Sequence, residues 1–289
     1  MAKTVDAGFE SLVTLLSPSS VETQAAASHR ASIEACLKTN FGMTSFFRSG
    51  SFGHHTSVSG YSDVDYFAVI PTAKLKENSS VSLQDIRGAL ATRFPKTGVT
   101  VRSPAVVVPF GTSAWERHEI TPADYVGITS GGHRVFDIPN RGEGWMRSSP
   151  GAHNAWVNAA NAKLGNRLKP LIRLVKAWNY FHGAGIRSFY LELRTTEYAL
   201  GESVLIYRFD VKGALQHLKT KGLAAMQDPE SVSGLVYPCT DSNKAVALSK
   251  IDTAITRASS ALAAEQAGRI GDAFEWWDKF FNYRFPSYS

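Results

Sequence analysis

Cysteine is scarce in this chain of 289 residues, which contains only Cys36 and Cys239. Two cysteines so far apart provide neither a disulfide framework nor the paired spacing of a metal-binding module. Long apolar runs are also missing, since no segment approaches the roughly 20 residues of a membrane-spanning helix. The N-terminus lacks the apolar core of a signal peptide. We therefore expect a globular, cytoplasmic protein with one large or two smaller domains.

The chain also lacks a strong excess of charge. It has 31 Lys and Arg residues against 25 Asp and Glu residues, a formal net charge of +6. This balance suits a polyanionic ligand such as a nucleoside triphosphate or a nucleic acid, but the basic residues are scattered along the sequence. Neither internal repeats nor low-complexity tracts are present. Composition therefore permits a nucleotide-binding function without selecting it.

The most informative segment runs from residue 50 to residue 65, GSFGHHTSVSGYSDVD. Asp63 and Asp65 lie two positions apart at the start of the apolar run 66–70, whose aromatic and β-branched residues predict a strand. Residues i and i+2 of a strand point to the same face. Two carboxylates on one face repel each other unless a cation lies between them, and oxygen ligands favour Mg²⁺ or Mn²⁺. The pair therefore predicts a metal site.

A glycine–serine pair precedes these carboxylates. Gly50 lets the backbone approach a phosphate closely, and Ser51 can cap a short helix whose N-terminus attracts anions. His54 and His55 are neighbours on that short helix and do not share a face, so we expect them to be exposed or to contact phosphate. The segment as a whole predicts a phosphate-binding turn beside a metal site.

The rest of the chain divides into a sheet-forming half and a helical half. Helical spacing from 5 to 38, interrupted near 17–20, precedes a first strand that ends at residue 48. We predict a helix over 83–94, strands over 98–102, 105–110 and 115–120, a surface loop over 127–152, and helices over 153–182, 189–200, 211–224, 243–267 and 271–281. The sequence thus indicates an α+β protein with a mixed sheet in a domain of residues 1–150, which includes the N-terminal helix. A helical domain of residues 151–289 follows, with the ligand in a cleft between the two.

A two-metal site for phosphoryl transfer usually includes a third carboxylate from a neighbouring strand. The candidate is Glu119, three residues before Pro122-Ala123. Glu116 is an alternative, but it lies three positions away and would face the other side of an extended strand. His118 points away from Glu119 on such a strand, so we expect it to have a structural role.

The order of Gly-Ser, Asp-x-Asp and an acidic residue before Pro-Ala resembles the polymerase-β-like nucleotidyltransferases. Within them it resembles the group that contains oligoadenylate synthase, cyclic GMP–AMP synthase and the bacterial CD-NTases of CBASS anti-phage systems. The segments RLKPLIRLVKAWN at 167–179 and SFYLEL at 188–193 resemble this group's phosphate-contacting helix and the helix after it. The resemblance implies a bilobed protein with a central cleft and a C-terminal domain like that of oligoadenylate synthase. One departure is Glu119, because the family commonly has Asp at the third position.

This resemblance implies a nucleotidyltransferase that uses two Mg²⁺ or Mn²⁺ ions. It would join ATP, GTP or other nucleoside triphosphates into a cyclic di- or trinucleotide second messenger for CBASS signalling and release pyrophosphate. A separate effector protein would read the product, and no RNA activator is indicated. Two alternatives stay open: a linear-oligonucleotide or RNA-tailing nucleotidyltransferase, and a catalytically silent relative that binds nucleotide or RNA.

The resemblance also assigns roles to single residues. Asp63, Asp65 and Glu119 are the implied catalytic metal ligands. The implied nucleotide contacts are Gly50 and Ser51 to the β- and γ-phosphates, Lys176 and Ser188 to the triphosphate, and Phe189 to the donor base. Each of the last three has a structural alternative: Lys176 as a solvated helix lysine, Ser188 as a helix cap and Phe189 as part of the core.

Overall fold

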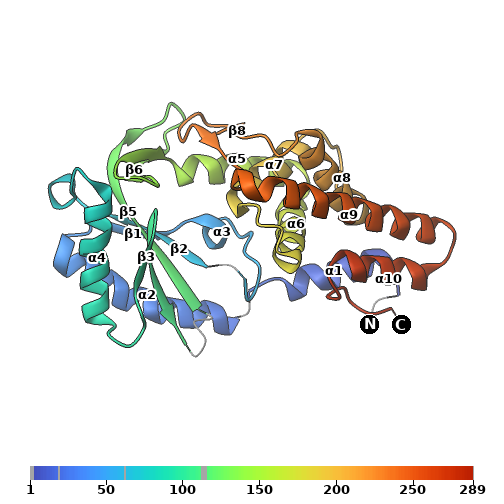
Figure 1. Ribbon diagram of the computed structural model, residues 1–289, viewed down its shortest axis with the longest axis horizontal. Coiled ribbons are helices and arrows are strands. Elements are labelled where there is room, and N and C mark those ends of the chain that lie inside the picture. Colours follow the sequence, from blue (N-terminus) through green and yellow to red (C-terminus); the bar gives the residue numbers. More distant parts are fainter. Residues whose placement is uncertain (1–2, 19, 62, 112–115, 289) are drawn as a thin grey trace.

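The computed structural model describes residues 3–288 apart from 19, 62 and 112–115, and it describes only the backbone of 20–26. One half of the molecule contains a mixed seven-stranded sheet, and the other half is helical (Figure 1). This is the α+β architecture predicted from the sequence. The strands follow the spatial order β1-β2-β5-β4-β3, and β6 and β7 extend the sheet beside β5. The strands are β1 (Ser45–Arg48), β2 (Val64–Val69), β3 (Thr100–Arg102), β4 (Ala105–Phe110), β5 (Glu116–Ile128), β6 (Arg134–Pro139) and β7 (Trp145–Ser148).

The centre of the sheet is the parallel pair of β2 and β5. Strand β2 reads VDYFAV, and all its side chains are buried except that of Asp65, which is half-buried. Its register places Asp65 beside Glu119 and Val64 beside His118. Strands β1 and β4 flank this pair and run antiparallel to it. Charged residues thus lie on central strands, a position that apolar residues normally occupy.

The prediction of a surface loop over residues 127–152 is wrong. Strand β5 continues to Ile128, β6 and β7 follow as an antiparallel extension of the sheet, and a helix begins at Pro150. The prediction failed because Gly, Arg and Ser residues are frequent in this segment, although β6 places Phe136 and Ile138 in a small hydrophobic core; β7 has no buried residue. Strand β6 forms by backbone pairing with the long β5, and β7 by pairing with β6, contacts that the local sequence does not encode.

Two helices cover the sheet on the face that carries Tyr66. Helix α2 (Ser20–Phe41) and helix α4 (Ser79–Arg93) pack against each other and against the strands. Their buried side chains share one hydrophobic core with those of the sheet, including Ile33, Leu37, Ile86 and Leu90. Between β1 and β2 lies the single turn of helix α3 (Gly50–Gly53), and a 3-10 turn, η1 (Thr72–Lys74), follows β2.

The second half has its own hydrophobic core, centred on helix α6 (Leu168–His182). The helix predicted over 153–182 is divided, because Gly165 and Asn166 both adopt positive φ and end α5 (Pro150–Lys163). The other elements of this half are α7 (Ser188–Ala199), α8 (Tyr207–Thr220), α9 (Asp241–Gln266), α10 (Ile270–Phe280) and the short hairpin of β8 (Met226–Gln227) and β9 (Leu235–Val236).

The N-terminal helix α1 (Val5–Leu15) packs in this second core. Phe9 contacts Trp277 with ring centroids 4.8 Å apart, and Figure 1 shows α1 beside α10. The predicted sheet domain of residues 1–150 included this helix, whereas in the structure it packs with the helical half.

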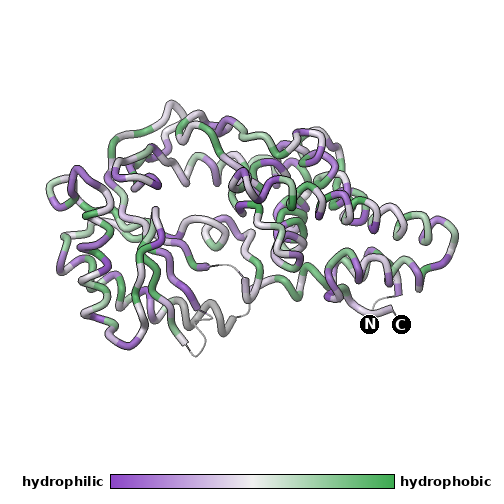
Figure 2. The backbone as a smooth tube through the Cα atoms, in the orientation of Figure 1, coloured by the Kyte–Doolittle hydropathy of each residue, from purple (hydrophilic) through white to green (hydrophobic). Residues whose placement is uncertain are grey.

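Hydrophobic and hydrophilic residues alternate along the helices rather than collecting in one apolar span (Figure 2). Within the described residues, no helix combines the length and the apolar character that crossing a bilayer requires.

Candidate active site

The structure brings the three predicted carboxylates together at one end of the β2–β5 pair. Asp65 and Glu119 are direct neighbours across the two strands, and Asp63 lies immediately before β2. The Arg117 guanidinium lies 3.4 Å from Asp63 Oδ1 and 3.9 Å from Glu119 Oε1, so it lies between these two carboxylates. The three carboxylates therefore meet as expected, with Asp65 on β2, Glu119 on the neighbouring β5 and Asp63 at the residue before β2.

The carboxylates raise one another's proton affinity. Burial raises the pKa of Asp65 well above its ordinary value, and the charges of Glu119 and Asp63 raise it further. Burial also raises the pKa of Glu119 to about 7, with additional contributions from the charge of Asp63 and a hydrogen bond to it. Carboxylates so placed retain protons unless positive charge compensates them. This all-oxygen donor set fits a hard divalent cation such as Mg²⁺.

Two arginines supply part of the compensating charge. Besides Arg117, Arg102 of β3 lies 3.7 Å from Glu119 Oε1, and both arginines lower the pKa of that carboxyl group. Neither arginine was predicted to be a site residue from the sequence. Arg117 had a usable signal, since it lies two positions before Glu119 and therefore shares its face of the strand.

The glycine–serine turn packs directly against the carboxylates. Gly50 has a φ of +55°, and a β-carbon at this position would lie 2.0 Å from Asp65 Oδ2. The Ser51 backbone N–H donates a hydrogen bond to the Asp65 carboxylate. The Ser49 N–H donates to the Asp65 carbonyl at 2.9 Å. The turn therefore holds Asp65 in place and requires glycine at position 50.

A buried polar network connects the segment after this turn to the helical half. Lys176 of α6 donates to Thr56 Oγ1 at 2.8 Å and to Glu192 Oε2 at 2.6 Å. Glu192 of α7 also bonds His54 Nδ1 at 2.5 Å. The expectation that His54 is exposed or contacts phosphate is wrong, because it is buried against Glu192, a partner far away in sequence. His55 is exposed, as expected.

The charges in this network balance. Burial acts to raise the pKa of Glu192, but Lys176 and His54 lower it well below its usual range. The ammonium of Lys176 is 1% exposed, so it is not the solvated helix lysine of the structural alternative. Its charge also lowers the pKa of Asp65, which shows that its field reaches the carboxylate cluster.

Arg173, one turn before Lys176, fixes the same segment through its backbone. Its guanidinium donates to the carbonyl of Ser57 at 2.8 Å and to that of His55 at 3.0 Å. A third bond goes to Ser17 Oγ at 3.0 Å. Helix α6 thus holds the chain between the glycine–serine turn and Asp63.

Ser188 and Phe189 lie at the start of α7. Ser188 Oγ is 2.7 Å from the hydroxyl of Tyr180, whose ring stacks on Tyr61 at a centroid distance of 5.5 Å. Phe189 is half-buried, packs against the helical core and lies 5.0 Å from the ring of His153. Tyr61 belongs to the segment that leads to Asp63, so these residues connect the motif with α6 and α7.

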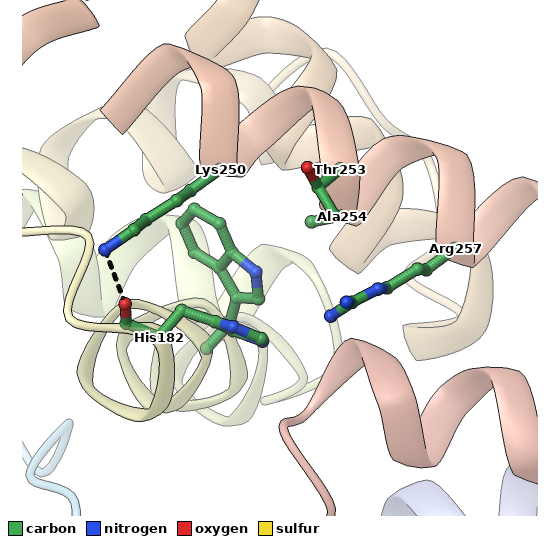
Figure 3. A pocket seen from close by; sticks show the side chains of 6 residues that line it. His182, Lys250, Thr253, Ala254 and Arg257 are labelled. Carbon is green, nitrogen blue, oxygen red and sulfur yellow. Dashed lines mark hydrogen bonds between the residues drawn. The ribbon is translucent and has the colours of Figure 1, made fainter. Parts of the chain in front are cut away.

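A small cavity of about 80 Å³ lies elsewhere, between α6 and α9 (Figure 3). His182, Lys250 and Arg257 are among its lining residues, and Lys250 Nζ donates to the His182 carbonyl at 2.7 Å. None of the residues predicted to bind nucleotide or metal lines it. The cavity is therefore not the predicted site.

The mixed sheet that presents these carboxylates beside a glycine–serine turn has the polymerase-β-like fold of solved CD-NTase structures. Within this class, the family model of the Second Messenger Oligonucleotide or Dinucleotide Synthetase domain matches residues 3–161, more than half of the chain. The chain belongs to that family.

Comparison with individual proteins agrees with this membership. A probable cyclic nucleotide synthase of Bacillus cereus strain VD146 is 23% identical over 214 residues, which cover 73% of this chain and 64% of that protein. The match thus spans slightly less than two thirds of that relative's length. CdnC of E. coli MS115-1, solved with ATP, has a TM-score of 0.74 at 18% identity, covering 97% of this chain and 98% of CdnC.

Two further structures share the fold. CdnG, a CD-NTase of Bradyrhizobium diazoefficiens solved with GTP, has a TM-score of 0.72 at 13% identity and covers 96% of this chain and 98% of its own. The cyclic AMP–GMP synthase DncV of Vibrio cholerae, solved with a linear intermediate, has a TM-score of 0.69 at 15% identity. The match covers 85% of this chain and 71% of DncV.

Proposed function

We propose that this protein is a metal-dependent nucleotidyltransferase that joins nucleoside triphosphates into a cyclic di- or trinucleotide second messenger and releases pyrophosphate. The observation that carries the proposal is the convergence of Asp63, Asp65 and Glu119 beside the turn at Gly50 and Ser51. The raised pKa values of Asp65 and Glu119 indicate a site that needs a bound cation. Membership of the synthetase family and the likeness to a probable cyclic nucleotide synthase support the type of product.

In this proposal Asp63, Asp65 and Glu119 hold two Mg²⁺ or Mn²⁺ ions. Such ions, when bound, lower the pKa of an attacking hydroxyl and stabilise negative charge on the departing pyrophosphate. Asp63 and Asp65 position the triphosphate of the donor nucleotide, and Glu119 serves the side of the attacking ribose hydroxyl. Arg117 lies between Asp63 and Glu119, and its guanidinium would be available to phosphate oxygens if bound cations neutralised these two carboxylates.

The turn and α6 provide the remaining contacts to the triphosphate. Gly50 and Ser51 donate hydrogen bonds to the β- and γ-phosphates. The turn that presents them requires glycine at position 50. Lys176 contributes positive charge from the α6 side while its ammonium remains bonded to Thr56 and Glu192. Ser188 adds a hydroxyl contact. Phe189 stacks on the donor base, a contact that tolerates several bases.

ATP and GTP are the proposed substrates, since structures that share this fold were solved with one or the other. We place the protein in the cytoplasm, where both nucleotides are available, and in CBASS anti-phage signalling, with a separate effector that reads the product. A further partner protein is consistent with the complex of E. coli MS115-1 CdnC with HORMA, which has a TM-score of 0.72 to this chain.

The test is the mass of the product that the purified protein forms from all four nucleoside triphosphates with Mg²⁺ or Mn²⁺. A cyclic product resists phosphatase and has the mass of two or three nucleoside monophosphates less one water for each bond. The Asp65→Asn variant should form none. Linear, phosphatase-sensitive products would replace the proposal with an oligonucleotide-tailing activity. Nucleotide binding without any product would favour a silent relative.

A further inference from the structure

A second cluster of ligand side chains lies on the reverse face of strand β5, away from the carboxylates. It consists of His29 of α2 with Glu116 and His118 of β5. Glu116 Oε1 is 2.8 Å from His29 Nδ1 and 2.6 Å from His118 Nε2. The nitrogen and oxygen ligand atoms of all three side chains lie within 4.8 Å of one another. Glu116 and His118 alternate with Arg117 and Glu119 along the strand, so the two clusters occupy opposite faces.

Aromatic rings hold both imidazoles in position. The His29 ring stacks on Phe110 with a centroid distance of 3.8 Å and an interplanar angle of 3°. The His118 ring is parallel to that of Tyr66 at 5.6 Å, and Phe110 meets it edge-on at 5.4 Å. The two rings therefore have fixed orientations, and both direct a nitrogen at the same carboxylate oxygen.

Glu116 is a buried carboxylate whose ion-pair partners among the described residues are all imidazoles. An imidazole carries a positive charge only when it is protonated, so neither partner supplies Glu116 with a permanent one. A neutral imidazole brings a lone pair to the cluster but no net charge. A buried carboxylate without a permanent positive partner is costly, and a cation would neutralise it.

We propose that His29, Glu116 and His118 form a zinc-binding site distinct from the catalytic carboxylates. Two imidazoles and one carboxylate are a ligand set that Zn²⁺ prefers, whereas the all-oxygen catalytic site suits Mg²⁺. Zinc bonds of about 2.0–2.2 Å place tetrahedral ligand atoms about 3.3 Å apart, so shifts on the order of 1 Å would convert the hydrogen-bonded cluster into a coordinated one.

Coordination needs lone pairs on His29 Nδ1 and His118 Nε2. The ring proton of His118 must then reside on Nδ1, a buried atom that has no hydrogen-bond partner within the described part of the chain. A proton there has no acceptor among the described residues, a cost that the metal bonds must offset. His29, whose side chain is 37% exposed, gives the ion a route to solvent, from which a water would supply the fourth ligand. The bound ion would fasten α2 to the strand that carries Glu119.

The test uses the Asp65→Asn variant as the parent, so that binding at the catalytic carboxylates is weakened and the outcome does not depend on the proposed enzymatic activity. We expect the parent to retain about one equivalent of Zn²⁺ after dialysis, measured by elemental analysis, and to unfold at a higher temperature with zinc than with a chelator. Co²⁺ substituted for zinc should give the visible absorption of a tetrahedral nitrogen–oxygen site.

Adding His29→Asn should abolish the zinc retention, the zinc-dependent rise in Tm and the cobalt spectrum. This variant changes the half-exposed member of the cluster and leaves its buried members in place. The matched control is His133→Asn in the β5–β6 turn, which should keep all three signals. Equal zinc content with and without His29 would place the metal elsewhere and overturn the proposal. If the parent bound neither metal, the three side chains would be only a hydrogen-bonded relay.

Discussion

The α-carbon of Gly50 lies against the carboxylate of Asp65. A β-carbon at position 50 would be 2.0 Å from Asp65 Oδ2 and 2.6 Å from its carboxyl carbon, and the φ of +55° also favours glycine. The phosphate-binding turn and the metal site are therefore one packed unit. A change in either should displace the other.

The substitution Gly50→Ala tests this contact. We expect kcat/KM for product formation to fall at least about 100-fold, the scale of losing one well-placed electrostatic contact, because Asp65 must move away from the cation site. Gly42→Ala is the matched control, since Gly42 has a φ of +65° with nothing within 4 Å of the added β-carbon. It should cost roughly 1 kcal/mol of stability and leave activity intact. Full activity of Gly50→Ala would show that the turn does not position Asp65.

Asp65→Asn should separate activity from stability. Product formation should become undetectable, while Tm in the presence of a chelator should equal or exceed that of the natural protein, because one of three mutually repelling carboxylates is removed. Asp124→Asn, five residues after Glu119 on β5, is the control. Asp124 accepts a hydrogen bond from Thr72 at 2.8 Å and has no contact with the cluster, so its loss should not affect turnover. A large fall in the Tm of Asp65→Asn would indicate a structural role instead.

The sequence was sufficient to predict the carboxylates and their strands. The spacing of Asp63 and Asp65 gave a shared face, and alternation correctly assigned Glu116 and His118 to the face opposite Glu119. The sequence did not predict that Asp65 pairs directly with Glu119, because the register between two strands that are distant in sequence depends on tertiary structure. The need of a two-metal site for a third carboxylate drew attention to Glu119, and the family resemblance then supported the choice.

What the sequence missed depends on distant partners. His54 looks like an exposed turn residue until Glu192, 138 positions later, accepts its hydrogen bond. Strand β6 likewise forms because it pairs with β5, and β7 forms because it pairs with β6. Arg117 is the exception, since its position two residues before Glu119 already placed it on the catalytic face. Local sequence patterns thus predicted the positions of the carboxylates, whereas contacts between distant segments determine which charged groups are paired.

The ion pair of Lys176 and Glu192, which also contacts His54 and Thr56, should be essential for stability. Glu192→Gln leaves the buried ammonium without its counter-charge, so we expect a loss of about 3–5 kcal/mol in the free energy of unfolding. The control is Asp252→Asn, which breaks the exposed pair with Lys219 and should cost at most about 1 kcal/mol. Urea denaturation measures both. Equal effects of the two variants would contradict the assignment of Lys176 to a buried network.

The raised pKa of Glu119 predicts how metal binding depends on pH. In the metal-free protein this carboxyl group has a pKa of about 7, against an ordinary value of 4.5, so between these values the folded state binds more protons than the unfolded state. The stability of the metal-free protein should therefore fall as pH rises through this window. Over the same window Mn²⁺ should bind more tightly as pH rises, because the cation competes with fewer protons on Glu119. Calorimetry in two buffers of different ionisation enthalpy would count the protons released on binding. In Glu119→Gln the proton release and the pH dependence should both diminish, and an undiminished dependence would assign the titration to another group.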